Sequence, residues 1–141
     1  MTPNQRMITI ADLVSDAATR TIGRARAKHI AGKMTAEQFD QAVAGYDRAI
    51  EHAARLTTAA LHQTAVALSP LTTALEESVE RIKQAVQRID RTSDVLTILG
   101  KLLGFAAAIV LAVAAPALIP GAVAAGVTLA TTIHAVASDD E

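Results

Sequence analysis

The sequence contains no cysteine and no tryptophan, and its only aromatic residues are Phe39, Tyr46 and Phe105. The lack of cysteine excludes disulfides, cysteine nucleophiles and thiolate metal sites, and it leaves the cellular compartment open. With no tryptophan and one tyrosine, no aromatic belt marks the ends of a membrane span. The apolar residues, 51% of the chain, are almost all alanine, valine, leucine and isoleucine, and this mixture favours helices over strands.

Signatures of catalysis, metal binding and secretion are also missing. The sequence has no Gly-x-Ser-x-Gly motif and no glycine-rich phosphate loop. His52 and His62 lie on different faces of one predicted helix, without a carboxylate to complete a metal site. The N-terminus lacks a basic stretch followed by an uninterrupted apolar core, which is the pattern of a secretory signal. We therefore expect a non-enzyme made in the cytoplasm, with no metal, cofactor or small-molecule substrate.

Three amphipathic helices are predicted before residue 95, over residues 9–31, 36–68 and 70–93. Thr35 and Gln38 form a Thr-x-x-Gln capping box at the start of the second helix. Ser69-Pro70 has the pattern of an N-cap and a first helical residue, so it predicts the start of the third. The second and third helices are expected to pack as an antiparallel pair.

The apolar stripes of these two helices form the predicted seam of a bundle and of an oligomer. Most of the second helix presents only alanine and threonine there, which bury little area, so a monomeric bundle would be marginally stable. We therefore expect several copies to assemble. The seam residues are Phe39, Val43, Tyr46, Ile50, Leu75, Val79, Ile82, Val86 and Ile89.

The composition changes abruptly at Val95, because from there to Ala137 the only full charge is Lys101. Two prolines and a glycine interrupt this run, which predicts a hydrophobic helical hairpin over 95–137 that is broken at 116–121. Residues 138–141 add an acidic tail. The first half of the hairpin would be a helix about 31 Å long, close to the thickness of a hydrocarbon core of about 30 Å, and the second about 24 Å.

This hairpin favours lipid over the interior of a soluble domain. Two helices that are apolar all round need cover on every side, and each of the other helices offers one stripe. The predicted turn has no charged or polar side chain, although a turn exposed to water is normally polar. Against lipid, many of the residues are alanines, which are nearly neutral for insertion, so the pattern fits conditional insertion or insertion within an oligomer. In its apolar tip, 95–137 resembles the hydrophobic hairpin of colicin-type pore-forming domains, and this likeness of architecture implies membrane insertion.

Three groups of residues are predicted to act in the membrane. The GxxxG spacing lets helices approach closely, so the first group is a set of small residues at helix contacts: Gly100, Gly104, Ala108 and Gly126. Cations are expected at lipid headgroups or at an acidic patch of a neighbouring subunit: Arg20, Arg24, Lys28, Arg88, Arg91 and Lys101. The side chains expected to enter the bilayer are Leu99, Leu102, Leu103, Phe105, Ile109, Val110, Leu111, Val113, Leu118, Ile119, Val123, Val127, Leu129 and Ile133.

The sequence thus predicts an all-α fold in which amphipathic helices in residues 1–94 precede the hairpin. We expect an oligomeric protein that inserts into a lipid bilayer, permeabilises it, and is membrane-associated in its active state. Two alternatives stay open: a membrane-anchored or self-assembling scaffold, and a soluble interaction module whose hairpin is covered by a partner. Arg20, Arg24 and Lys28 form a basic stripe along one side of the first helix, but no aromatic residue adjoins it, so a nucleic-acid partner is disfavoured.

Overall fold

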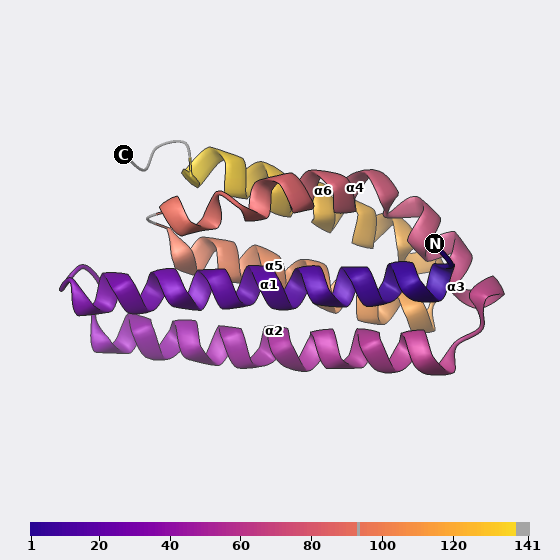
Figure 1. Ribbon diagram of the computed structural model, residues 1–141, viewed down its shortest axis with the longest axis horizontal. Coiled ribbons are helices and arrows are strands. Elements are labelled where there is room, and N and C mark those ends of the chain that lie inside the picture. Colours follow the sequence, from indigo (N-terminus) through magenta and orange to yellow (C-terminus); the bar gives the residue numbers. More distant parts are fainter. Residues whose placement is uncertain (93, 138–141) are drawn as a thin grey trace.

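The computed structural model describes residues 1–92 and 94–137, and its regular structure there is entirely helical, which confirms the predicted all-α class. Its long rods alternate in direction along one common axis (Figure 1). The elements are α1 (Pro3–Ile30), α2 (Ala36–His62), α3 (Ala65–Ala74), α4 (Glu76–Val86), the one-turn 3-10 helix η1 (Ile89–Arg91), α5 (Val95–Ala114), the one-turn 3-10 helix η2 (Pro116–Leu118) and α6 (Ile119–Ala137). The predicted acidic tail, residues 138–141, lies outside the described residues.

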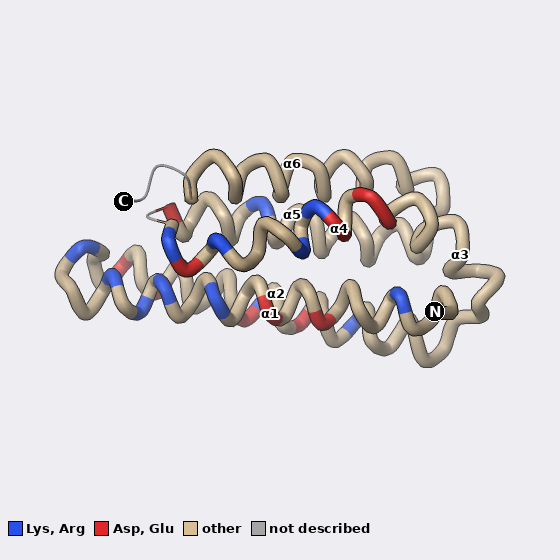
Figure 2. The backbone as a smooth tube through the Cα atoms, turned by 45° about the horizontal axis from the view of Figure 1, so that its top comes forward, with Lys and Arg blue, Asp and Glu red and all other residues tan. Residues whose placement is uncertain are grey.

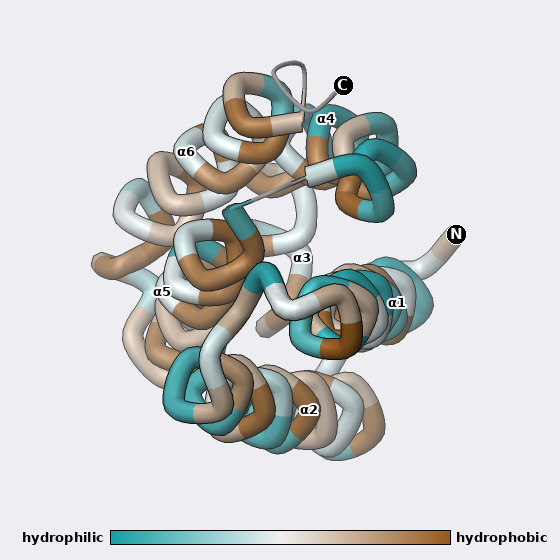
Figure 3. The backbone as a smooth tube through the Cα atoms, turned by 90° about the vertical axis from the view of Figure 1, so that its left-hand side faces the viewer, coloured by the Kyte–Doolittle hydropathy of each residue, from teal (hydrophilic) through white to brown (hydrophobic). Residues whose placement is uncertain are grey.

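Helix α5 occupies a central place in the packing, because α1, α2 and α6 all contact it. Seen along the axis, α4 and α6 lie at one side of the cross-section, α1 and α5 in the middle, and α2 at the opposite side (Figure 3). The largest fully buried side chains come from every helix, so the hairpin shares one core with the preceding helices: Met7, Leu56, Leu68, Leu75, Ile82, Phe105, Ile109, Leu129 and Ile133 are among them. Burying one such side chain contributes about 1.5–3 kcal/mol, which is what holds the hairpin in place.

Helix α1 begins at Pro3, six residues before the predicted start near residue 9. The hydroxyl of Thr2 accepts a hydrogen bond from the Gln5 backbone N–H, and the Gln5 side chain accepts one from the Thr2 N–H. This capping box, together with a proline in the first helical position, satisfies the first turn and sets the true start. The same device appears at Thr35 and Gln38, where the predicted start of α2 is confirmed.

The predicted corner at Ser69-Pro70 was wrong. Helix α2 ends at His62 instead of residue 68, and the chain turns at Gln63, where Thr64 caps α3 by accepting a hydrogen bond from Ala67 N–H. Pro70 therefore lies inside α3 and not at the start of a helix. A proline in a helix interior removes one backbone hydrogen bond and weakens the turn before it. The rod breaks at Leu75, between α3 and α4 and five residues after Pro70, and the predicted helix 70–93 is three shorter elements.

The predicted antiparallel pairing of the second and third helices was also wrong, because α2 packs against α1 and α5. Both α1 and α2 bury mainly small side chains, and small side chains allow two helices to approach closely. The fully buried stripe of α2 is Ala42, Ala49, Ala53, Leu56 and Ala60. The larger seam residues predicted on this helix lie beside that stripe and are half-buried: Phe39, Val43, Tyr46 and Ile50. Of the seam residues predicted after residue 70, Val79 is half-buried and the others are buried: Leu75, Ile82, Val86 and Ile89.

Candidate membrane-insertion hairpin

The two helices of the hairpin begin and end where local chemistry requires. The Asp94 side chain caps α5 by accepting a hydrogen bond from Thr97 N–H at 3.3 Å. Ala115 adopts an extended backbone because the residue before a proline avoids the helical region, and this ends α5. Pro120 lies in the first turn of α6, where no backbone N–H is needed. The predicted break at 116–121 is therefore shorter in the structure, since α6 already begins at Ile119.

Each helix of the hairpin buries one face, although both are apolar all round. The buried residues of α5 are Val95, Ile98, Leu99, Leu102, Phe105, Ala106, Ile109 and Ala112. Those of α6 are Ala122, Gly126, Leu129, Ala130, Ile133 and Ala137. The segments Val95–Ala114 and Pro116–Ala137 are both long and apolar enough to cross a membrane, and only 44% and 28% of their most apolar windows are buried within the chain.

Two glycines mark the closest approaches of the hairpin to its neighbours. A Cβ on Gly126 would lie 2.9 Å from the Phe105 ring and 2.9 Å from Ser78 Cβ, so α6 crosses both α5 and α4 at this point. The Ser78 hydroxyl also donates a hydrogen bond to the Val123 carbonyl at 3.4 Å. A Cβ on Gly45 of α2 would lie 3.6 Å from Leu99 Cβ. These contacts fix the hairpin against α2 at one place and against α4 at another.

The GxxxG stripe lies on the opposite, outward face of α5. A Cβ on Gly100 or Gly104 would meet nothing within 4 Å, so these glycines make no close contact inside the chain. Ala108, the third predicted small contact on α5, is half-buried. The exposed surface continues along the same side to Leu111, whose side chain is 57% exposed. Small residues keep the apolar area of this face low, and this limits its cost in water.

The predicted insertion residues divide among three environments. Six are buried in the core: Leu99, Leu102, Phe105, Ile109, Leu129 and Ile133. Five are half-buried at its edge: Leu103, Val110, Val113, Ile119 and Val123. Three are exposed: Leu111, Leu118 and Val127. The inner face of the hairpin can therefore meet lipid only after α5 and α6 separate from the other helices.

The predicted cations gather at the end of the bundle where α5 begins (Figure 2). The Arg20 guanidinium bridges Asp16 at 3.3 Å and Asp90 at 3.2 Å, and Arg24 Nε donates to the Thr92 carbonyl at 2.6 Å. These contacts tie α1 to η1 and to the segment that leads into α5. The remaining predicted cations are Lys28, which is half-buried, and Arg88, Arg91 and Lys101, which are exposed.

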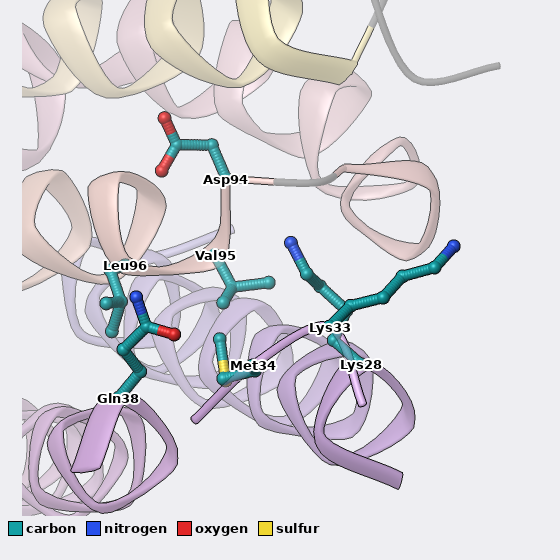
Figure 4. A pocket seen from close by; sticks show the side chains of 7 residues that line it. All are labelled: Lys28, Lys33, Met34, Gln38, Asp94, Val95 and Leu96. Atoms are coloured by element: carbon teal, nitrogen blue, oxygen red, sulfur yellow. The ribbon is translucent and has the colours of Figure 1, made fainter. Parts of the chain in front are cut away.

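A shallow hollow of about 130 Å³ lies at this basic end, between the α1–α2 turn and the start of α5 (Figure 4). Its lining combines Lys28, Lys33 and Asp94 with apolar Met34 and Val95. It is smaller than the roughly 300–1,000 Å³ of typical ligand sites. Among the residues that the structure describes, no three histidine, aspartate or glutamate side chains gather as a metal site.

One apolar region escaped the sequence reasoning. On either side of the α2–α3 turn, Leu61 in the last turn of α2 is 70% exposed and Val66 in the first turn of α3 is 84% exposed. This turn lies at the same end of the bundle as the hairpin tip (Figure 1). The signal was present in the sequence, because no aspartate, glutamate, lysine or arginine occurs between Arg55 and Glu76. A continuous helix over residues 36–68, which the sequence predicts, has no turn near residue 63 and gives no reason to expect exposed apolar side chains there.

No protein-family model matches the chain, and comparisons with curated proteins and with solved structures give no match. The functional conclusion therefore depends on the geometry and chemistry of the chain itself.

Proposed function

We propose that the α5–α6 hairpin leaves the bundle and inserts into a lipid bilayer, and that several inserted copies together permeabilise the membrane. The observation that carries this proposal is that the outward face of the hairpin and its turn are uncharged except for Lys101. Helices α1, α2 and α4 all carry acidic and basic side chains on their exposed faces. The uncharged surface of the hairpin thus lies on the two helices that are both long and apolar enough to span lipid.

The bundle described above is then the closed, water-soluble form. Its inner contacts shield most of the large side chains of the hairpin, while the outer face presents glycine, alanine and threonine with a few larger side chains such as Leu111, Leu118 and Val127. After release, both faces of α5 and α6 meet acyl chains without placing an aspartate or glutamate in the bilayer, where one charge at the centre costs about 3 kcal/mol. Lys101 lies in the second turn of α5, so its side chain reaches the headgroups by snorkelling.

Leakage from lipid vesicles tests insertion directly. Leu111→Asp and Ala108→Asp each add a charge to the half of α5 nearest the hairpin tip, which has to cross the acyl chains on insertion, so we expect both to abolish dye release. Leu111 is more than half exposed in the closed form, so Leu111→Asp leaves the fold intact, as circular dichroism will verify. Ile30→Asp is the matched control, because Ile30 is 78% exposed and lies outside the hairpin. Unchanged release by Leu111→Asp would refute insertion of α5.

A reversible lock tests whether the hairpin has to leave the bundle. The chain has no cysteine, and the 3.6 Å between the Gly45 and Leu99 Cβ positions suits a disulfide, whose Cβ atoms lie about 3.5–4.5 Å apart. Oxidised Gly45→Cys/Leu99→Cys ties α5 to α2 and leaves residues 100–114 free, about 22 Å of helix, which is too short to span. We expect no leakage when this variant is oxidised and recovery after reduction. Equal leakage in both states would show that α5 need not separate from α2.

The outward GxxxG stripe is the proposed contact between inserted copies, because small residues let helices pack closely in lipid. Gly104 is exposed and a Cβ there meets no atom within 4 Å in the closed form, so Gly104→Leu tests assembly with little disturbance of the bundle. We expect vesicle binding to persist while leakage falls. A scaffold or anchor would instead give stable membrane association of the natural sequence without any leakage.

A further inference from the structure

The two ends of the bundle differ sharply in chemistry. At one end lie the α1–α2 turn, the start of α5 and most of the lysines and arginines of α1 (Figure 2). At the other lie the α2–α3 turn, the α5–α6 turn and the N-terminus (Figure 1). This second end, called the apolar end below, exposes Leu61 by 70%, Val66 by 84% and Leu118 by 46%.

Two segments distant in the sequence form the apolar end. The α2–α3 turn belongs to the uncharged run between Arg55 and Glu76, and the α5–α6 turn belongs to the uncharged run after Lys101. Helix α3 contacts both α5 and α6, so the two runs lie side by side. Helix α3 therefore adjoins the two helices of the hairpin at this end.

The α2–α3 turn is held firmly, so the exposure of its side chains is built into the fold. Asn4 Nδ2 donates hydrogen bonds to the carbonyl oxygens of Ala60 and Gln63, each at 2.9 Å, which satisfies the end of α2. Thr64 caps the start of α3 on the other side of the turn. Leu61 and Val66 thus project from helix ends that these three hydrogen bonds hold in place.

We infer that the apolar end is the surface on which the closed protein first docks onto a lipid bilayer, with Leu61 and Val66 entering the acyl-chain boundary beside the hairpin tip. This inference rests on the proposed function and names the contact that precedes insertion. Helices α5 and α6 run along the bundle axis toward this end (Figure 1), so the hairpin enters tip first without turning. The basic end then stays on the outer side of the membrane.

Lipid fits the apolar end better than a second copy of the chain does. The exposed leucine and valine side chains stand on two separate turns, whereas a standard protein interface takes about 20–30 residues from each partner. Nearby charge is largely balanced, because Arg6 pairs with Glu76 at the first turn of α4. Docking is therefore driven by apolar burial, with little dependence on anionic lipid.

A single-tryptophan probe locates the contact, because the natural chain contains no tryptophan. Val66→Trp is placed at the apolar end and Ile30→Trp, matched in exposure at 78%, at the basic end. Vesicles of phosphatidylcholine, alone or mixed equally with phosphatidylglycerol, are added to each full-length variant. We expect a blue shift and quenching by brominated lipid for Val66→Trp with both vesicles, and neither effect for Ile30→Trp.

Charge insertion tests whether the contact matters for binding. We expect Leu61→Asp/Val66→Asp to lower vesicle affinity by about tenfold or more in flotation assays, with leakage reduced in parallel. Both side chains are largely exposed, so the fold is retained, and circular dichroism verifies it. Ile30→Asp is the matched control, because Ile30 is 78% exposed and lies outside the apolar end and the hairpin, so it should bind and permeabilise vesicles normally.

The outcomes separate this inference from the proposed function. If vesicles leak while the Val66→Trp probe stays in water, the apolar end is not the docking surface, although insertion stands. If the probe enters lipid and no leakage follows, docking stands and permeabilisation is wrong. A blue shift that depends on protein concentration without vesicles would assign the apolar end to a second copy and overturn lipid docking.

Discussion

Two antiparallel helical hairpins, α1–α2 and α5–α6, pack on the same core but treat their outward faces in opposite ways. The outer faces of α1 and α2 carry charges such as Asp12, Arg26 and Glu51. The outer faces of α5 and α6 carry glycine, alanine, threonine and a few larger apolar side chains. Burial of one face is therefore common to both hairpins, and only the chemistry of the other face makes the second one suitable for lipid.

The turns of the two hairpins also differ in polarity, as their outer faces do. The α1–α2 turn uses Gly32, whose φ of 75° lies in the left-handed region, followed by the Thr35–Gln38 capping box. The α5–α6 turn has no side-chain cap on η2 and depends on two prolines to end one helix and start the next. The two prolines lack backbone N–H groups and the turn has no polar side chain, so fewer hydrogen bonds to water are lost when it enters lipid.

The largest expected effect comes from the inner face of α5. Phe105 is fully buried, so Phe105→Ala should lower the free energy of unfolding by about 3–5 kcal/mol. Leu111→Ala, on the exposed face of the same helix, should change it by no more than about 0.5 kcal/mol. Urea unfolding followed by circular dichroism measures both. Similar losses for the two variants would contradict the orientation of α5. Because Phe105→Ala weakens the closed form, it should also speed vesicle leakage.

A smaller change in stability is expected when a glycine on the inner or the outer face of the hairpin is replaced by alanine. Gly126→Ala places a Cβ 2.9 Å from the Phe105 ring and from Ser78 Cβ, so we expect a loss of about 1–3 kcal/mol of stability. Gly104→Ala meets no atom within 4 Å and improves helix propensity, so we expect a gain of up to about 1 kcal/mol. The two changes in unfolding free energy should thus have opposite signs. Matching signs would mean that α6 does not cross α5 at Gly126.

The smallest expected effect compares the two turns. Gly32→Ala forces a side chain into the left-handed region and should destabilise the protein by about 1–2 kcal/mol. Gly121→Ala lies in the first turn of α6 with open space around it, so it should be neutral or slightly stabilising. Thermal unfolding of the two variants, measured side by side with the natural sequence, gives both changes in stability. A neutral Gly32→Ala would show that the α1–α2 turn does not need this backbone conformation.

The sequence predicts a helix boundary correctly where a few neighbouring residues decide it. The Thr35–Gln38 box begins α2, and the abrupt change at Val95 begins α5. Pro70 was misread because a proline is most easily accepted in the first turn of a helix, whereas the cap at Thr64 and the packing of Leu68 and Leu71 keep it inside α3. The energy of those distant contacts is not visible in a local pattern.

The sequence by itself determined that the chain is helical, where its charges stop, and that Val95–Ala114 and Pro116–Ala137 are long and apolar enough to span lipid. Only the tertiary structure decided which face of each apolar helix is buried, because helices that are apolar all round have no stripe to orient them. It also decided that the GxxxG stripe faces outward, and it brought the α2–α3 turn to the same end of the bundle as the hairpin tip. Such choices depend on how well distant side chains fit together, and that fit exists only after the helices have packed.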